Sequence, residues 1–83
     1  MIKKSLFLEA KAQVYQILAS EDSLPTRRSL DIGSEGILNK AIENVKAVRA
    51  RGYDTGYQCK ILTTAGVGFF VATKIIRSLG DAK

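Results

Sequence analysis

The chain has 83 residues, 46% of them hydrophobic, and its 13 Lys and Arg residues exceed eight Asp and Glu residues to give a net charge of +5. This length suits one core, so we expect a single domain over residues 1–83 and no second one. The one cysteine, Cys59, excludes an internal disulfide, and the lack of histidine argues against a structural zinc site, so we predict no metal and no cofactor.

The first third of the chain predicts a strand, a helix and a second strand. Residues 1–8 fit a short strand, and residues 9–20 fit a helix in which Ala10, Val14 and Ile17 recur at helical spacing. Pro25 ends this helix, because it lacks an amide donor and biases the preceding residue away from helical geometry. Residues 26–32 alternate apolar and polar positions, which is typical of a strand.

The clearest predicted element is a helix over residues 35–51. Ser34 is placed to cap its first amides, and Gly52 is placed to terminate it. One stripe of apolar side chains follows the helical repeat. Its members are Leu38, Ala41, Ile42, Val45 and Val48.

The last third predicts a hairpin. Residues 57–61 alternate as in a half-buried strand, residues 65–66 supply the turn, and residues 67–75 form the return strand. The rival interpretation is a helix from Thr64 to Leu79. Gly66 and Gly68 would each cost such a helix ~1 kcal/mol relative to alanine, so we favour the hairpin.

One stretch of the chain resembles a known family. Leu30-Asp31-Ile32-Gly33, followed by Leu38-Asn39-Lys40-Ala41-Ile42 and then by Val45 and Arg49, resembles the Alba superfamily, and within it the stage V sporulation protein S family. The resemblance covers roughly residues 29–77 and is strongest over residues 30–53. It implies an α+β fold, a two-layer βαβαββ arrangement with two helices on a small mixed sheet. It also implies a homodimer that binds DNA or RNA through a basic surface without catalysis.

Ten basic residues are candidates for phosphate contacts. Three are implied by the resemblance, because Alba-type proteins place basic residues near the end of the first strand. The others follow from the pattern: two on the predicted strand over residues 26–32, three off the apolar stripe of the predicted helix, and two on the polar side of the hairpin. The alternative for each is a solvated edge or helix face. In chain order they are Lys3, Lys4, Lys11, Arg27, Arg28, Lys40, Lys46, Arg49, Lys60 and Lys74.

Two aromatic pairs allow two interpretations each. Tyr53 and Tyr57 are suited to stacking on bases, but tyrosines beside a turn more often close the edge of a core, which we favour. Phe69 and Phe70 cannot both face inward on a strand. An exposed phenylalanine there is more typical of a dimer surface than of a ligand pocket.

Three functions are consistent with these patterns. The first is a homodimer in the cytoplasm or on the nucleoid that binds DNA or RNA through phosphate contacts. The second is a winged-helix DNA-binding regulator of the GntR type, which requires residues 26–32 to be helical and residues 66–72 to form the wing. The third is a regulator that binds another protein and no nucleic acid.

The composition argues against other classes of function. With no histidine and no recognisable acid/base pair among its carboxylates, we predict neither an enzyme nor a protein with a small-molecule substrate. No apolar run reaches the ~20 residues that a membrane-spanning helix needs, so no membrane partner is expected.

Overall fold

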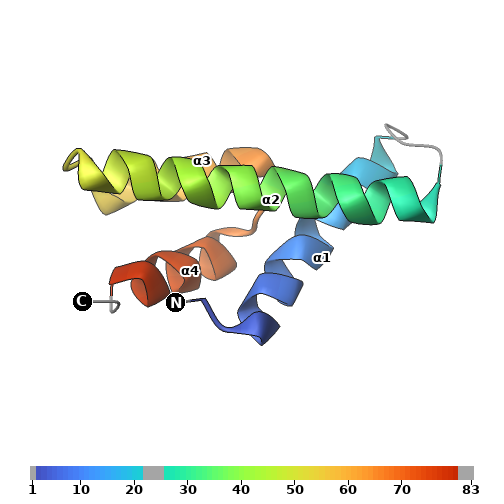
Figure 1. The fold of residues 1–83 in the computed structure, drawn as a ribbon, viewed down its shortest axis with the longest axis horizontal. Helices are drawn as coiled ribbons and strands as arrows, with labels where there is room; N and C mark the ends of the chain where they lie inside the picture. Colours follow the sequence, from blue (N-terminus) through green and yellow to red (C-terminus); the bar gives the residue numbers. More distant parts are fainter. Residues whose placement is uncertain (1, 22–25, 81–83) are drawn as a thin grey trace.

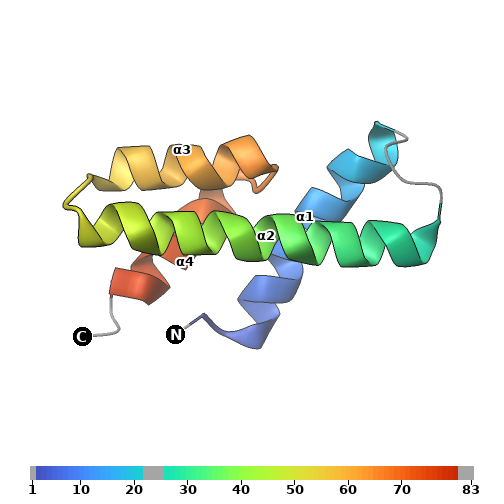
Figure 2. The same cartoon turned by 45° about the horizontal axis from the view of Figure 1, so that its top comes forward.

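The computed structural model describes residues 2–21 and 26–80, and every regular element within these residues is a helix (Figure 1). The helices are α1 (Lys4–Ser20), α2 (Arg27–Ala50), α3 (Thr55–Ala65) and α4 (Phe69–Gly80). The longest of these helices is α2, with 24 residues. Figures 1 and 2 show α3 running back alongside its C-terminal half, α1 crossing its N-terminal half obliquely, and α4 on the side of α2 away from α3 in Figure 2.

The predicted α+β fold is wrong, because none of the described residues lies in a strand. The segments 26–32, 57–61 and 67–75, predicted as strands, lie almost wholly within α2, α3 and α4. The predicted first strand overlaps the beginning of α1. The Alba-like sheet that the resemblance implied is therefore excluded for the described part of the chain.

The winged-helix alternative is right on one point and wrong on another. Its requirement that residues 26–32 be helical is met, since α2 begins at Arg27 and Thr26 is its N-cap. Its prediction that residues 66–72 form a β-stranded wing is wrong, because residues 69–72 form the first turn of α4.

One apolar core joins all four helices. Each helix contributes residues at helical spacing, as α4 does with Val71, Ala72, Ile75 and Ile76 at positions i, i+1, i+4 and i+5. This repeat does not fit a strand, in which residues 71 and 72 would face opposite sides. The largest fully buried apolar side chains are Leu38, Leu62, Ile75, Val14 and Val45.

Helix α2 begins earlier than predicted because its cap is Thr26. The hydroxyl Oγ1 of Thr26 accepts the backbone amide of Ser29 at 3.0 Å. Ser34, the predicted cap, is fully buried inside the helix, and its hydroxyl donates to the carbonyl of Asp31 at 3.0 Å. The alternation that favoured a strand was misleading, since Ile32 is 60% exposed.

Both predicted helices exist, and their C-terminal ends lie within one residue of the predicted positions, although both helices begin earlier than predicted. The predicted helix over residues 9–20 is the larger part of α1, which ends at Ser20. The predicted helix over residues 35–51 is the larger part of α2, whose C-cap is Arg51; the left-handed residue Gly52 (φ +87°) follows it. Pro25, the predicted helix breaker, lies outside the described residues.

Residues 66–68 form the turn between α3 and α4. Gly66 is left-handed (φ +112°), and the Val67 amide donates to the carbonyl of Leu62 at 3.1 Å, as in a glycine helix cap. The Gly68 amide donates to Oε1 of Gln13 in α1 at 2.7 Å. The rival prediction of a helix from Thr64 to Leu79 was closer than the hairpin, because residues 69–79 are helical. The glycines impose no cost on a helix interior, since Gly66 and Gly68 lie in the turn between α3 and α4.

One glycine substitution in this turn and a comparison substitution in α2 test the assigned geometry. Gly66→Ala should lower the free energy of unfolding by roughly 1–2 kcal/mol, because a left-handed L residue is strained. Its Cβ would also lie 3.1 Å from Cδ1 of Ile17. Gly36→Ala, in the exposed interior of α2 with nothing within 4 Å of its Cβ, should raise that free energy by about 0.5–1 kcal/mol. Urea unfolding followed by circular dichroism measures both. Changes of the same sign would contradict the assigned turn.

Candidate functional site

Helices α3 and α4 form a helix-turn-helix pair. Only residues 66–68 separate Ala65, the last residue of α3, from Phe69, the first of α4. A turn of this length, often with glycine, also joins the two helices of the DNA-binding helix-turn-helix motif, whose second helix lies in the major groove. Here α4 also contacts α1, so it is held from two sides.

The outward face of α4 is apolar at its beginning and basic further along. Phe69 and Phe70 are 64% and 82% exposed, and their rings meet edge to face with centroids 6.0 Å apart. Lys74 and Arg77 follow on the same face, one and two turns later, and both are exposed. Residues 55–80 contain no Asp or Glu, so α3 and α4 offer these cations no acidic partner of their own.

Thr73 lies at the edge of this face, but its hydroxyl is engaged. Its Oγ1 donates to the carbonyl of Phe69 at 2.9 Å, and the free thiol of Cys59 lies 3.8 Å from it. A hollow of about 410 Å³ between α3 and α4 adjoins these groups. The free hydrogen-bond donors of the face are therefore the charged ends of Lys74 and Arg77.

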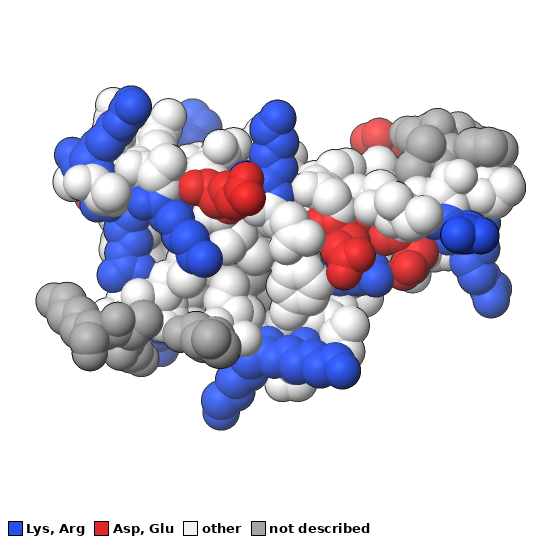
Figure 3. Space-filling model, in the orientation of Figure 1, with Lys and Arg blue, Asp and Glu red and all other residues white. Residues whose placement is uncertain are grey.

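The ten predicted phosphate-contact residues are spread over all four helices. Figure 3 shows Lys and Arg side chains on several parts of one face, with acidic groups between some of them. Lys3 precedes α1 as its N-cap, and Lys4 and Lys11 lie within α1. Arg27 and Arg28 are the first residues of α2 and both are exposed, so their predicted position on a strand was wrong.

The remaining five candidates occupy three separate surfaces. Lys46 and Arg49 line a hollow of about 340 Å³ that α2 forms with Leu79 of α4. Lys40 and Lys60 line a groove between α2 and α3. Lys74 lies on α4, so the prediction that Lys60 and Lys74 project from one face of a hairpin was wrong.

Lys11 is paired within the molecule. Its Nζ lies 2.8 Å from Oδ1 of Asp31, which joins α1 to α2. The hydrogen bond to Asp31 raises the pKa of Lys11, desolvation opposes the rise, and the negative charges of Asp31 and Glu35 add to it. Because its charge already has a partner, Lys11 is the least available of the ten for a polyanion.

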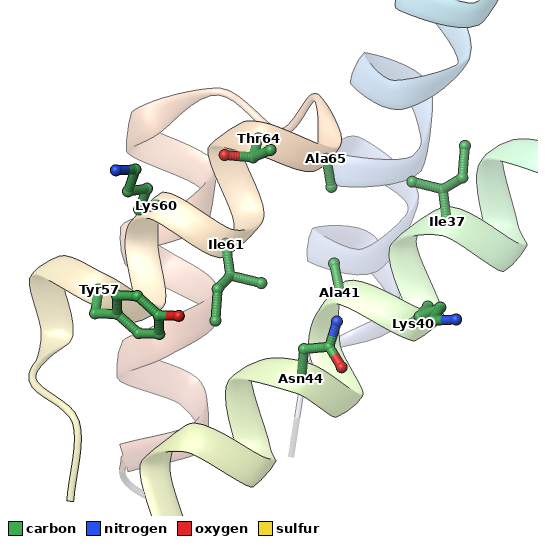
Figure 4. A pocket seen from close by; sticks show the side chains of 9 residues that line it. All are labelled: Ile37, Lys40, Ala41, Asn44, Tyr57, Lys60, Ile61, Thr64 and Ala65. Carbon is green, nitrogen blue, oxygen red and sulfur yellow. The ribbon is translucent and has the colours of Figure 1, made fainter.

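The groove between α2 and α3 combines apolar, aromatic and basic groups (Figure 4). Its volume is about 540 Å³. Tyr57 lines it and stacks on Tyr53 with ring centroids 4.8 Å apart. These tyrosines are 46% and 50% exposed, so neither belongs to the buried core.

Sequence reasoning missed Arg77 and the shared outward face of Phe69 and Phe70. Two signals could have found them. One is the lack of acidic residues over residues 55–80; the other is the i, i+1, i+4, i+5 spacing of the buried residues of α4, which places residues 70, 74 and 77 together on the opposite side.

Comparison of the chain with protein-family models, with characterised proteins and with solved structures finds no match. Within residues 2–21 and 26–80, no helix has both the length and the apolar character to cross a bilayer. The same residues contain no group of three or more potential metal ligands among Cys, Asp and Glu.

The pairing of Lys11 predicts a measurable titration. Since the pKa of Lys11 is raised in the folded state, its pairing stabilises the fold below the ordinary value of 10.5 and this stabilisation is lost as the pH rises through the raised value. Asp31→Asn should lower the pKa of Lys11, as followed by NMR of its side-chain carbon Cε. Glu35→Gln is the matched control and should lower it less, because Glu35 acts only through its charge. An equal effect of both variants would contradict the dominant role of the hydrogen bond.

Proposed function

We propose that the protein is a non-enzymatic DNA-binding protein in which α3 positions α4 in the major groove. The observation that carries this proposal is the exposed, acid-free outward face of α4, presented by a helix pair joined through a three-residue glycine turn. An α-helix with its side chains is about 10–12 Å wide, which matches the roughly 12 Å width of the major groove. The N-terminal residues of such a helix lie nearest the base edges.

The residues of this face have chemistry suited to a duplex. Arg77 is able to donate two parallel hydrogen bonds, either to the O6 and N7 acceptors of guanine or to a phosphate. Lys74 supplies a point charge for a phosphate oxygen. Phe70 offers an apolar surface for the methyl group of thymine, the one apolar feature of the major-groove edge.

Basic residues of α2 are positioned to extend the contact to the backbone. Lys46 and Arg49 border the C-terminal end of α4, where they line a hollow together with Leu79. Phosphates on either side of a groove lie within reach of residues beside the inserted helix, and such contacts fix its register. The net charge of +5 favours the encounter with a polyanion. A cytoplasmic or nucleoid location follows from this function.

A second candidate function is favoured by the two phenylalanines. Adjacent apolar rings at 64% and 82% exposure also suit a contact with another protein, including a second copy of this chain. The homodimer remains a prediction, since a single chain does not test it. Two copies of α4 about 34 Å apart would match successive major-groove turns, so dimerisation through another surface is compatible with DNA binding.

Charge reversal on α4 tests the proposed interface. Arg77→Glu should weaken binding to a duplex about tenfold or more, since loss of a phosphate or base contact costs roughly 1–3 kcal/mol. The control is Arg28→Glu, which makes the same change of charge at the far end of α2 (Figure 1). Anisotropy of a fluorescent duplex at low salt measures both affinities. Equal losses would indicate that net charge alone governs binding and would contradict a role for α4.

A substitution at Phe70 separates the two candidate functions. If Phe70 contacts bases, Phe70→Ser should lower duplex affinity while the dependence of affinity on salt stays the same, because no counterion-releasing charge is removed. Arg77→Glu should reduce that dependence. Sedimentation of the wild type and Phe70→Ser gives their masses in parallel. Unchanged duplex affinity with a loss of dimer would assign the phenylalanines to self-association.

A further inference from the structure

The groove between α2 and α3 is longer than one pocket. The hollow of about 540 Å³ and a neighbouring one of about 340 Å³ share Asn44, Tyr57 and Ile61, so they form one continuous depression. The second hollow continues the groove along α2 to Arg51. No residue of α1 or α4 lines either hollow, so this groove is separate from the proposed DNA-binding face.

The residues along the groove repeat as they do where helices pack side by side. Steps of four and three residues alternate on α2 and again on α3, which is the spacing of a seam that receives another helix. Ala41 belongs both to this line of residues and to the buried stripe of α2, whereas Ile37 and Asn44 are exposed. The line therefore borders the core, and its outer side is uncovered within the described residues. The seam residues are Ile37, Ala41, Asn44 and Val48 on α2, Arg51 at its C-cap, and Tyr57, Ile61 and Thr64 on α3.

The charges around the groove are all of one sign. Lys40 and Lys60 stand on opposite walls of the first hollow, and Arg51 lies in the second. No carboxylate lines either hollow, and none of these three cations has an ion-pair partner in the described part of the chain. The groove therefore offers an apolar floor between uncompensated positive rims.

We propose that this groove docks an acidic amphipathic helix of a partner protein. The apolar side of such a helix would cover the floor formed by Ala41, Ile61 and Ala65, while its flanking carboxylates would meet the lysines on the rims. This proposal does not depend on DNA binding by α4, because the two surfaces share no residue.

Other occupants fit the groove less well. The phosphates of a nucleic acid would meet the rims but leave the apolar floor without a partner. A second copy of this chain, with its net charge of +5, would bring the same sign of charge. A small molecule is typically enclosed on most sides, whereas Ala41 is the one buried residue among those lining the first hollow.

Binding of two synthetic peptides to the full chain tests the proposal. The probe is an amphipathic peptide of about three heptads, with leucine at the seam positions and glutamate beside them. A matched peptide carries lysine in place of each glutamate. NMR titration of the ¹⁵N-labelled protein should show shifts of the amides of residues 37–51 and 57–65 with the glutamate peptide and none with the lysine peptide.

Charge reversal on the rims provides the second measurement. The double variant Lys40→Glu with Lys60→Glu should weaken the glutamate peptide about tenfold. The control double variant, Lys3→Glu with Lys4→Glu, changes the net charge equally on exposed residues at the beginning of α1 and should bind as the wild type does. Circular dichroism confirms that each variant is folded.

The outcomes are distinct. Shifts confined to the groove, together with loss of affinity only in the rim variant, support the proposal. Shifts on α4, equal binding of both peptides, equal losses in the two double variants or no binding at all would overturn it. So would self-association that shifts the groove amides without peptide. Duplex affinity of the rim variant, measured in parallel, keeps a failure here separate from a failure of DNA binding by α4.

Discussion

The direction of α4 depends on the turn at residues 66–68 and on its attachment to α1. Left-handed geometry at Gly66 ends α3 and redirects the chain, and the Gly68 amide is held by the side chain of Gln13 at 2.7 Å. This hydrogen bond spans 55 residues of sequence, so the angle of α4 is a property of the whole fold. The turn lets α3 pack against α2 while α4 packs against α1. Without it, the outward face of α4 would not be held in one orientation.

Helix α2 serves two purposes because its two sides differ. One side carries the buried stripe that includes Leu38 and Val45, which packs into the core that all four helices share. The adjacent side, with Ile37 and Asn44, forms one wall of an open groove with α3. A small domain has little apolar surface to spare beyond its core. An apolar groove left uncovered on such a chain is therefore a more informative feature than an isolated exposed residue.

The distribution of acidic residues separates structural cations from those free to bind. Asp31 takes Lys11 into an ion pair between α1 and α2, and Glu35 adds its negative charge nearby. Residues 55–80 carry no Asp or Glu, so Lys60, Lys74 and Arg77 keep their charge for solvent or a ligand. The cations of α3 and α4 thus have no acidic neighbour within these two helices, although the ten basic residues predicted as one surface belong to several.

The sequence by itself determined the larger part of two helices, at residues 9–20 and 35–51. A long apolar stripe and a terminating glycine identified the second helix, and residues of high helix propensity favoured a helix over a strand for the first. The sequence did not decide between helix and strand over residues 26–32, 57–61 and 67–75, because short apolar runs satisfy both repeats and the resemblance favoured the strand. It also did not reveal that Lys11 is paired or that Phe70 is exposed. Those facts depend on which faces of α1, α2 and α4 meet, and only the tertiary structure decided that, because burial is a property of neighbours distant in sequence.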